Sequence, residues 1–124
     1  MLPLHWVISS RDRIATVTGE GQVGRSDIEH WLDIVDGAML LPFRKLVDLG
    51  AATLDLQVED MMALGIRFRA HHASAMGALA MVLPDDAPEA IERGLGILAA
   101  GDRPMRLFRS VPRARRWLAT ASTG

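Results

Sequence analysis

The chain lacks cysteine and is poor in aromatic residues. The absence of cysteine excludes disulfides, thiolate metal ligands and cysteine nucleophiles. Aromatic residues make up 5% of the 124 residues and the formal net charge is −1, so neither base stacking nor a general positive field favours nucleic acid as a partner. The longest apolar run, MGALAMVLP (76–84), is far shorter than the roughly 20 residues of a membrane helix.

These absences favour a cytoplasmic protein with no nucleic-acid partner and no integral membrane segment. The N-terminus, MLPLHWVISSRD, has neither the basic region nor the long apolar run of a signal peptide. Hydrophobic residues make up 49% and charged residues 23% of the chain, which is ordinary for one globular domain. We expect that domain over residues 1–120, with 121–124 as a tail.

Strand and helix patterns alternate along most of the chain. Residues 4–10 and 13–19 are rich in β-forming residues and predict a hairpin, followed by a glycine-rich loop over 19–24. The next helix is expected to begin at a capping box of Ser26 and Glu29. Further strands are predicted at 41–49, 76–84 and 104–110, and further helices at 57–73, 86–101 and 111–120. A loop at 50–55 and a cap by Asp55 are expected before the helix at 57–73.

This order predicts an α/β domain of the pattern ββαβαβαβα. Strands that alternate with helices pair in parallel through right-handed crossovers. The run at 76–84 is apolar throughout, as in a central strand that is covered on both faces. The strand at 104–110 is mixed in polarity, which predicts a position near an edge of the sheet. Because edge strands need protection, a homodimer remains an open alternative.

Two local patterns, together with the element order, resemble the STAS domain and its SpoIIAA-like group, which is related to anti-sigma-factor antagonists. The first is the hairpin followed by DIEHWLDIV (27–35), and the second is RLFRSVPRARRWL (106–118). The resemblance spans nearly the whole chain. It implies a mixed sheet of about five strands in sequence order, with a right-handed βα superhelix. It also implies a non-enzymatic regulatory module with a protein partner.

In STAS antagonists, a helix begins with Asp-Ser-Ser-Gly, and a partner kinase phosphorylates a serine of this motif. On this resemblance Asp55 matches the aspartate, whereas Leu56 and Gln57 occupy the serine positions. Thr53 is the only hydroxyl nearby. The resemblance therefore implies a partner surface without the usual phosphoserine switch. We expect this surface to comprise Gly50, Thr53, Asp55, Leu56 and Gln57.

The acidic and histidine residues do not predict an active site. Acids at positions 48, 55, 59 and 60 could form an acid–base pair or a Mg²⁺ site, but helix capping and compensation of the helix dipole explain them more simply. His71 and His72 are neighbours in the predicted helix and point about 100° apart, so they do not suit a shared metal. No catalytic residue, metal ligand or cofactor is assigned.

An arginine cluster near the C-terminus is the remaining candidate site. Arg106, Arg109, Arg113 and Arg116 could bind a phosphate, a lipid headgroup or an acidic partner surface, although a solvated strand edge and helix face would carry the same residues. The alternative to a protein partner is a small apolar or lipid-like ligand of the CRAL-TRIO type. That alternative predicts an apolar cavity of at least about 300 Å³ between the helices and the sheet.

Overall fold

The computed structural model describes residues 4–37, 43–70, 77–99 and 105–120. These residues form nine elements in the order that the sequence predicts. The strands are β1 (Leu4–Ser9), β2 (Ile14–Gly24), β3 (Arg44–Asp55), β4 (Leu79–Val82) and β5 (Met105–Phe108). The helices are α1 (Arg25–Gly37), α2 (Val58–Ala70), α3 (Glu89–Ala99) and α4 (Val111–Thr120).

The strands form one five-stranded mixed sheet in the order β1-β2-β3-β4-β5. β1 is antiparallel to β2, and every later pair is parallel. The predicted fold class and strand order are therefore confirmed. β1 and β5 are the two edge strands, as the mixed polarity of the β5 segment predicts. The right-handed sense of the crossovers stays a prediction from the general rule.

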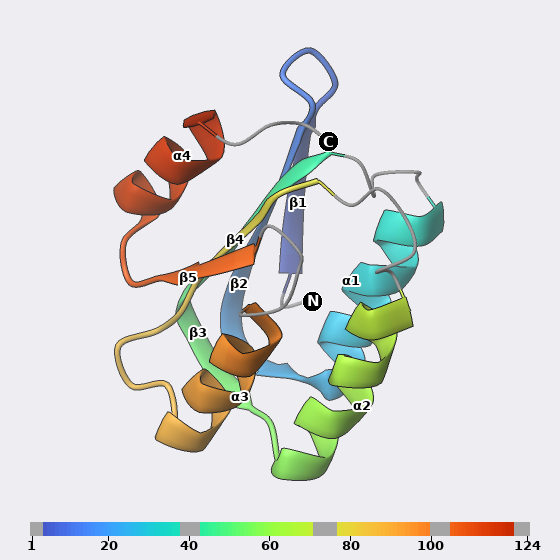
Figure 1. Ribbon diagram of the computed structural model, residues 1–124, viewed down its shortest axis with the longest axis vertical. Coiled ribbons are helices and arrows are strands. Elements are labelled where there is room, and N and C mark those ends of the chain that lie inside the picture. Colours follow the sequence, from blue (N-terminus) through green and yellow to red (C-terminus); the bar gives the residue numbers. More distant parts are fainter. Residues whose placement is uncertain (1–3, 38–42, 71–76, 100–104, 121–124) are drawn as a thin grey trace.

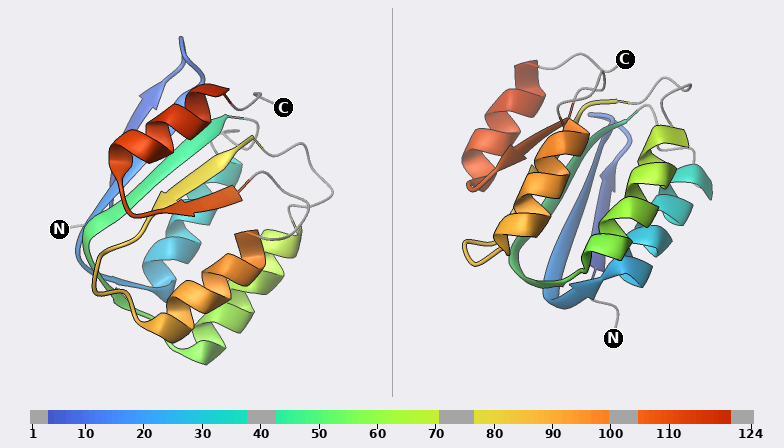
Figure 2. Two further views of the ribbon diagram at one scale, coloured as in Figure 1. Left: turned by 60° about the vertical axis from the view of Figure 1, so that its left-hand side comes forward. Right: turned by 60° about the horizontal axis from the view of Figure 1, so that its bottom comes forward.

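The helices cover the two faces of the sheet unequally. α1, α2 and α3 lie on one face and α4 lies on the other (Figures 1 and 2). The larger core lies under the three helices and includes Trp31 and Leu32 of α1, Leu64 of α2 and Leu95 of α3. The smaller core lies under α4, where Leu118 and its neighbours pack on β3 and β4. All four residues of β4 are buried, which confirms a central strand covered on both faces.

The middle strands are longer than the sequence predicts. β2 continues to Gly24 and β3 to Asp55, so the loops expected at 19–24 and 50–55 are wrong. The two segments pair with each other from Glu20 and Ala51 onwards, beyond a register shift at which β3 has one residue more than β2. Pairing between the two strands thus outweighs the local turn preference of the glycines. The sequence pattern of either segment alone does not predict this pairing.

The start of α1 differs from the predicted capping box. The helix begins at Arg25, and the Gly24 backbone N–H donates to Asp27 Oδ2 at 2.9 Å. Asp27 is the third residue of the helix and so fills the place that the glutamate of a capping box takes. Ser26 lies inside the first turn. The prediction of Ser26 as the cap, with Glu29 as its partner, is therefore wrong by two positions.

Lys45, the single lysine of the chain, is buried at the start of β3. Its side chain is 1% exposed and its Nζ donates a hydrogen bond to the Phe43 carbonyl oxygen at 2.7 Å. Burial disfavours the charged form of an amine. It lowers the pKa of Lys45 from 10.5 to about 8. Near neutral pH Lys45 is charged in both states, and holding this charge in the buried site lowers the free energy of unfolding.

This burial predicts how stability depends on pH. Between pH 8 and 10.5 the unfolded chain binds more protons at Lys45 than the folded chain, so the free energy of unfolding should rise with pH. Relative to a Lys45→Met variant, we expect the wild-type chain to gain up to about 3 kcal/mol across this window. Urea unfolding at a series of pH values measures the difference. A difference that stays constant with pH would show that Lys45 does not titrate in this range.

Candidate functional site

The free edge of the sheet at β5 exposes backbone polar groups. Among the described strands β5 pairs with β4 alone, and the Phe108 carbonyl oxygen accepts a hydrogen bond from the Leu83 N–H at 2.9 Å. Because successive residues of a strand direct their backbone groups to opposite sides, Arg106 and Phe108 face β4. The N–H and C=O of Leu107 face away from the sheet, and the strand ends at Phe108. This edge is therefore open to a further strand.

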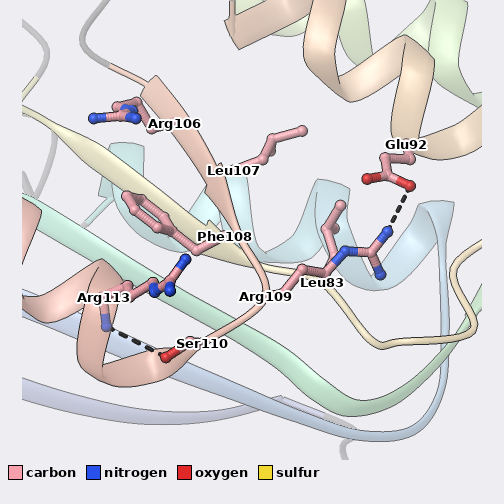
Figure 3. A pocket seen from close by; sticks show the side chains of 8 residues that line it. All are labelled: Leu83, Glu92, Arg106, Leu107, Phe108, Arg109, Ser110 and Arg113. Carbon is pink, nitrogen blue, oxygen red and sulfur yellow. Dashed lines mark hydrogen bonds and ion pairs between the residues drawn. The ribbon is translucent and has the colours of Figure 1, made fainter.

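An open pocket of about 680 Å³ lies along this edge. Figure 3 shows that Arg106, Phe108 and Arg113 lie on one side of the β5 ribbon, whereas Leu107 and Glu92 lie on the other. The pocket therefore follows the edge strand and includes side chains from both sides of it. Its lining residues are Leu83, Glu92, Arg106, Leu107, Phe108, Arg109, Ser110 and Arg113.

Arg109 is held by two partners inside this pocket. Its guanidinium donates to the Pro84 carbonyl oxygen and to Glu92 Oε2, both at 2.5 Å. These hydrogen bonds connect the end of β5 to the segment after β4 and to α3. The ion pair is about 40% exposed, with side-chain values of 41% and 42%, so we expect little net stabilisation from it. Its consequence for the site is that the charges of Arg109 and Glu92 cancel.

Arg106 and Arg113 differ from Arg109 in that no acid in the described ranges neutralises them. No carboxylate of the described residues forms an ion pair with either guanidinium. The Arg106 guanidinium lies 5.5 Å from the ring centroid of Phe108 and 5.9 Å from that of Trp117, which are cation–π distances. The two rings are themselves 5.9 Å apart. Arg106 is therefore positioned by aromatic contacts that leave its N–H donors free for an anion.

The structure thus brings three of the four arginines of the predicted cluster together. Arg106, Arg109 and Arg113 line the pocket, whereas Arg116 is exposed on α4 and is not one of the lining residues. The sequence did not predict that Glu92 belongs to this site. This residue lies on α3, far from the cluster along the chain, and no local pattern indicates that it would neutralise Arg109.

The predicted partner surface at the β3–α2 junction is only partly a surface. Gly50, Thr53, Asp55 and Gln57 are exposed. Leu56, however, is 7% exposed and belongs to the larger core, so its prediction as a surface residue is wrong. Its side chain anchors the chain between β3 and α2. This anchoring explains why a leucine stands at one of the two serine positions that the STAS resemblance assigns.

The cap of α2 also differs from the prediction. The Gln57 N–H donates to Asp60 Oδ2 at 2.7 Å, and the Gln57 carbonyl accepts from the Met61 N–H at 3.1 Å. Gln57 is therefore the residue that precedes the helix, and Asp60 caps it in the manner of a capping-box acid. Asp55 is the last residue of β3 and its prediction as the cap is wrong.

The acids near this junction do not converge. Asp48 and Asp55 lie in the same strand, at an interval of roughly 20 Å in extended chain, which is too far apart for the two carboxylates to act together. Asp48 Oδ1 accepts from the Gly50 N–H at 3.0 Å. Within the described residues, no group of three or more histidine, aspartate or glutamate side chains has the geometry to hold a metal ion. His71 and His72 lie outside the described residues.

An apolar hollow lies between β1, β2, β3, β4 and α1. Its volume is about 20 Å³, which is far below the roughly 300 Å³ of a small-molecule site. It therefore gives no support to the alternative of an apolar ligand. Its lining residues are Leu4, Val17, Val23, Ile28, Trp31, Val47, Leu49 and Met81.

Comparison with known proteins supports the fold. No protein-family model and no curated protein matches the sequence. The solved structure of an uncharacterised protein of the DUF3478 family from Shewanella loihica PV-4, described as having a SpoIIAA-like fold, superposes with a TM-score of 0.57. The alignment covers 93% of this chain and 91% of that chain at 16% sequence identity.

This chain has a SpoIIAA-like fold. The structural similarity confirms the fold that the STAS resemblance implies, and at this level of identity it extends to the fold alone. Among the described helices, none is long and apolar enough to cross a membrane.

The corrected cap of α2 leads to a direct comparison of two aspartates. Asp60→Ala should lower the free energy of unfolding by about 1 kcal/mol, because it removes the acceptor of the Gln57 N–H. Asp60→Asn should cost less, since an amide oxygen can still accept. Asp55→Ala should change stability by less than about 0.5 kcal/mol. Urea unfolding of the three variants decides between the two caps, and a larger loss in Asp55→Ala would restore the predicted one.

Proposed function

We propose that this chain is a non-enzymatic binding module that holds an anionic group of a protein partner in the pocket beside β5. The observation that carries this proposal is that Arg106 and Arg113 line an open pocket without a carboxylate partner among the described residues. Guanidinium groups bind carboxylates and phosphates through paired, charge-assisted hydrogen bonds.

The surroundings of the two arginines favour an anion. Glu92, the acid among the pocket-lining residues, is paired with Arg109. The pocket also adjoins the N-terminus of α4 at Val111, whose partial positive charge attracts anions. The Ser110 hydroxyl oxygen accepts a weak hydrogen bond from the Arg113 N–H at 3.4 Å. The aromatic contacts of Arg106 reduce the conformational freedom that this side chain would lose on binding.

The residues that line the pocket do not suggest a reaction. They include no histidine or lysine, and their single acid is already engaged by Arg109. A hydroxyl nucleophile needs an adjacent general base, and the described surroundings of Ser110 supply none. These features support binding over catalysis.

The proposed module differs from a STAS phosphoswitch at the β3–α2 junction. Leu56 and Gln57 have no hydroxyl to accept a phosphoryl group, and Thr53 remains the nearest candidate. The small volume of the apolar hollow gives no support to a lipid-like ligand. We propose that the module is cytoplasmic, as the sequence predicts.

Titration with inorganic phosphate tests the proposal. In ¹⁵N-labelled protein, the backbone and guanidinium N–H signals of Arg106 and Arg113 should shift and saturate against sodium chloride at matched ionic strength. The double variant Arg106→Ala/Arg113→Ala should bind at least about tenfold more weakly, because hydrogen bonds to charged groups are lost.

The control is Arg115→Ala, which removes an exposed arginine of α4 that does not line the pocket. This variant should bind phosphate like the wild-type chain. Equal binding by the double variant, or shifts that spread over all arginines without saturating, would contradict the proposed function.

A further inference from the structure

We infer that the partner segment is an acidic extended strand that pairs with the free edge of β5. This inference rests on the proposed function, because it assigns the anionic group in the pocket to such a segment. The partner is thus recognised by two kinds of contact, namely backbone hydrogen bonds to the strand edge and carboxylate contacts to the two free arginines.

The backbone geometry of β5 provides the first kind of contact. The Leu107 N–H and C=O face away from β4, and so do those of Met105 by the same alternation. A peptide that adds a strand to an open edge satisfies such groups and gains affinity from main-chain hydrogen bonds. The pocket is lined by five successive residues, 106–110. At about 3.3 Å per residue, the four residues of β5 accommodate a partner strand of roughly four residues.

The side chains on the two sides of β5 specify the composition of such a strand. Side chains alternate between the two faces of a sheet. On one side a partner strand would meet Arg106 and Arg113, and on the other it would meet Leu107, where the charge of Glu92 is already paired with Arg109 (Figure 3). The complementary sequence therefore alternates acidic with aliphatic residues, with its acids on the side of α4.

The other edge of the sheet does not offer this charge. β1 is the second edge strand, and Val7 and Ile8 are 69% and 44% exposed there. The sequence of β1, LHWVIS, contains no arginine or lysine. Electrostatic complementarity therefore directs an acidic strand to β5, because a cationic edge attracts it and an uncharged edge does not.

Blocked hexapeptides of alternating glutamate and valine provide the test, with binding measured by calorimetry. We expect the wild-type chain and Arg115→Ala to bind the acidic peptide, and Arg106→Ala/Arg113→Ala to bind at least about tenfold more weakly. The same peptide with lysine in place of glutamate should not bind.

Two N-methylated forms of the acidic peptide test the strand pairing. One carries methyl groups on every glutamate nitrogen and the other on every valine nitrogen. Alternate N–H groups of a paired strand face its neighbour, so one methylated peptide should lose at least about tenfold in affinity and the other should bind nearly as the parent does.

The outcomes separate this inference from the proposed function. If phosphate binds but the acidic peptide does not, or if both methylated peptides bind like the parent, the inference is overturned and the anion pocket stands. If neither phosphate nor the peptide binds, both proposals fail. If only one of the two methylated peptides loses binding, both the strand pairing and the anion pocket are supported.

Discussion

The parallel pairing of β3 with both β2 and β4 is the constraint on which the rest of the structure depends. β3 pairs with β2 along nearly its whole length and with β4 through Lys45–Asp48. Since parallel neighbours need a crossover, α1, α2 and α3 all connect strands over the same face (Figure 2). α4 covers the opposite face at β3, β4 and β5. Within the described residues the sheet therefore ends at β5, with both faces packed and no strand on its outer side.

Whether that edge can bind an anion depends on which of its arginines are already paired with an acid. Arg109 joins the end of β5 to Glu92 of α3 and to Pro84, so it has a structural role. Arg106 is held against Phe108 and Trp117, and these contacts do not neutralise its charge. The pocket therefore contains one arginine paired with an acid and two that have no acidic partner in the described part of the chain. An edge strand with charged side chains also resists pairing with identical copies, which favours an acidic partner.

Features confined to one segment were predictable from the sequence. The element order and the edge position of β5 follow from hydrophobic patterning and polarity, and the arginine cluster is contiguous enough to be seen directly. Features that depend on a second segment were not predictable. The extension of β2 to Gly24 requires its pairing with β3, the burial of Leu56 requires the packed core, and the neutralisation of Arg109 requires Glu92. The helix caps at Asp27 and Asp60 depend on where each helix begins, which local patterns locate only within a few residues.

In the proposed complex, the outward-facing backbone of β5 pairs with a partner strand. Amide hydrogen exchange at Leu107 tests this pairing most directly, because this N–H has no partner in the sheet, whereas the neighbouring Phe108 N–H faces β4. In the free protein, Leu107 should exchange fast and Phe108 slowly. Saturation with the alternating glutamate–valine peptide should slow the exchange of Leu107 markedly. Unchanged exchange at Leu107 under saturating peptide would show that the peptide does not pair with β5.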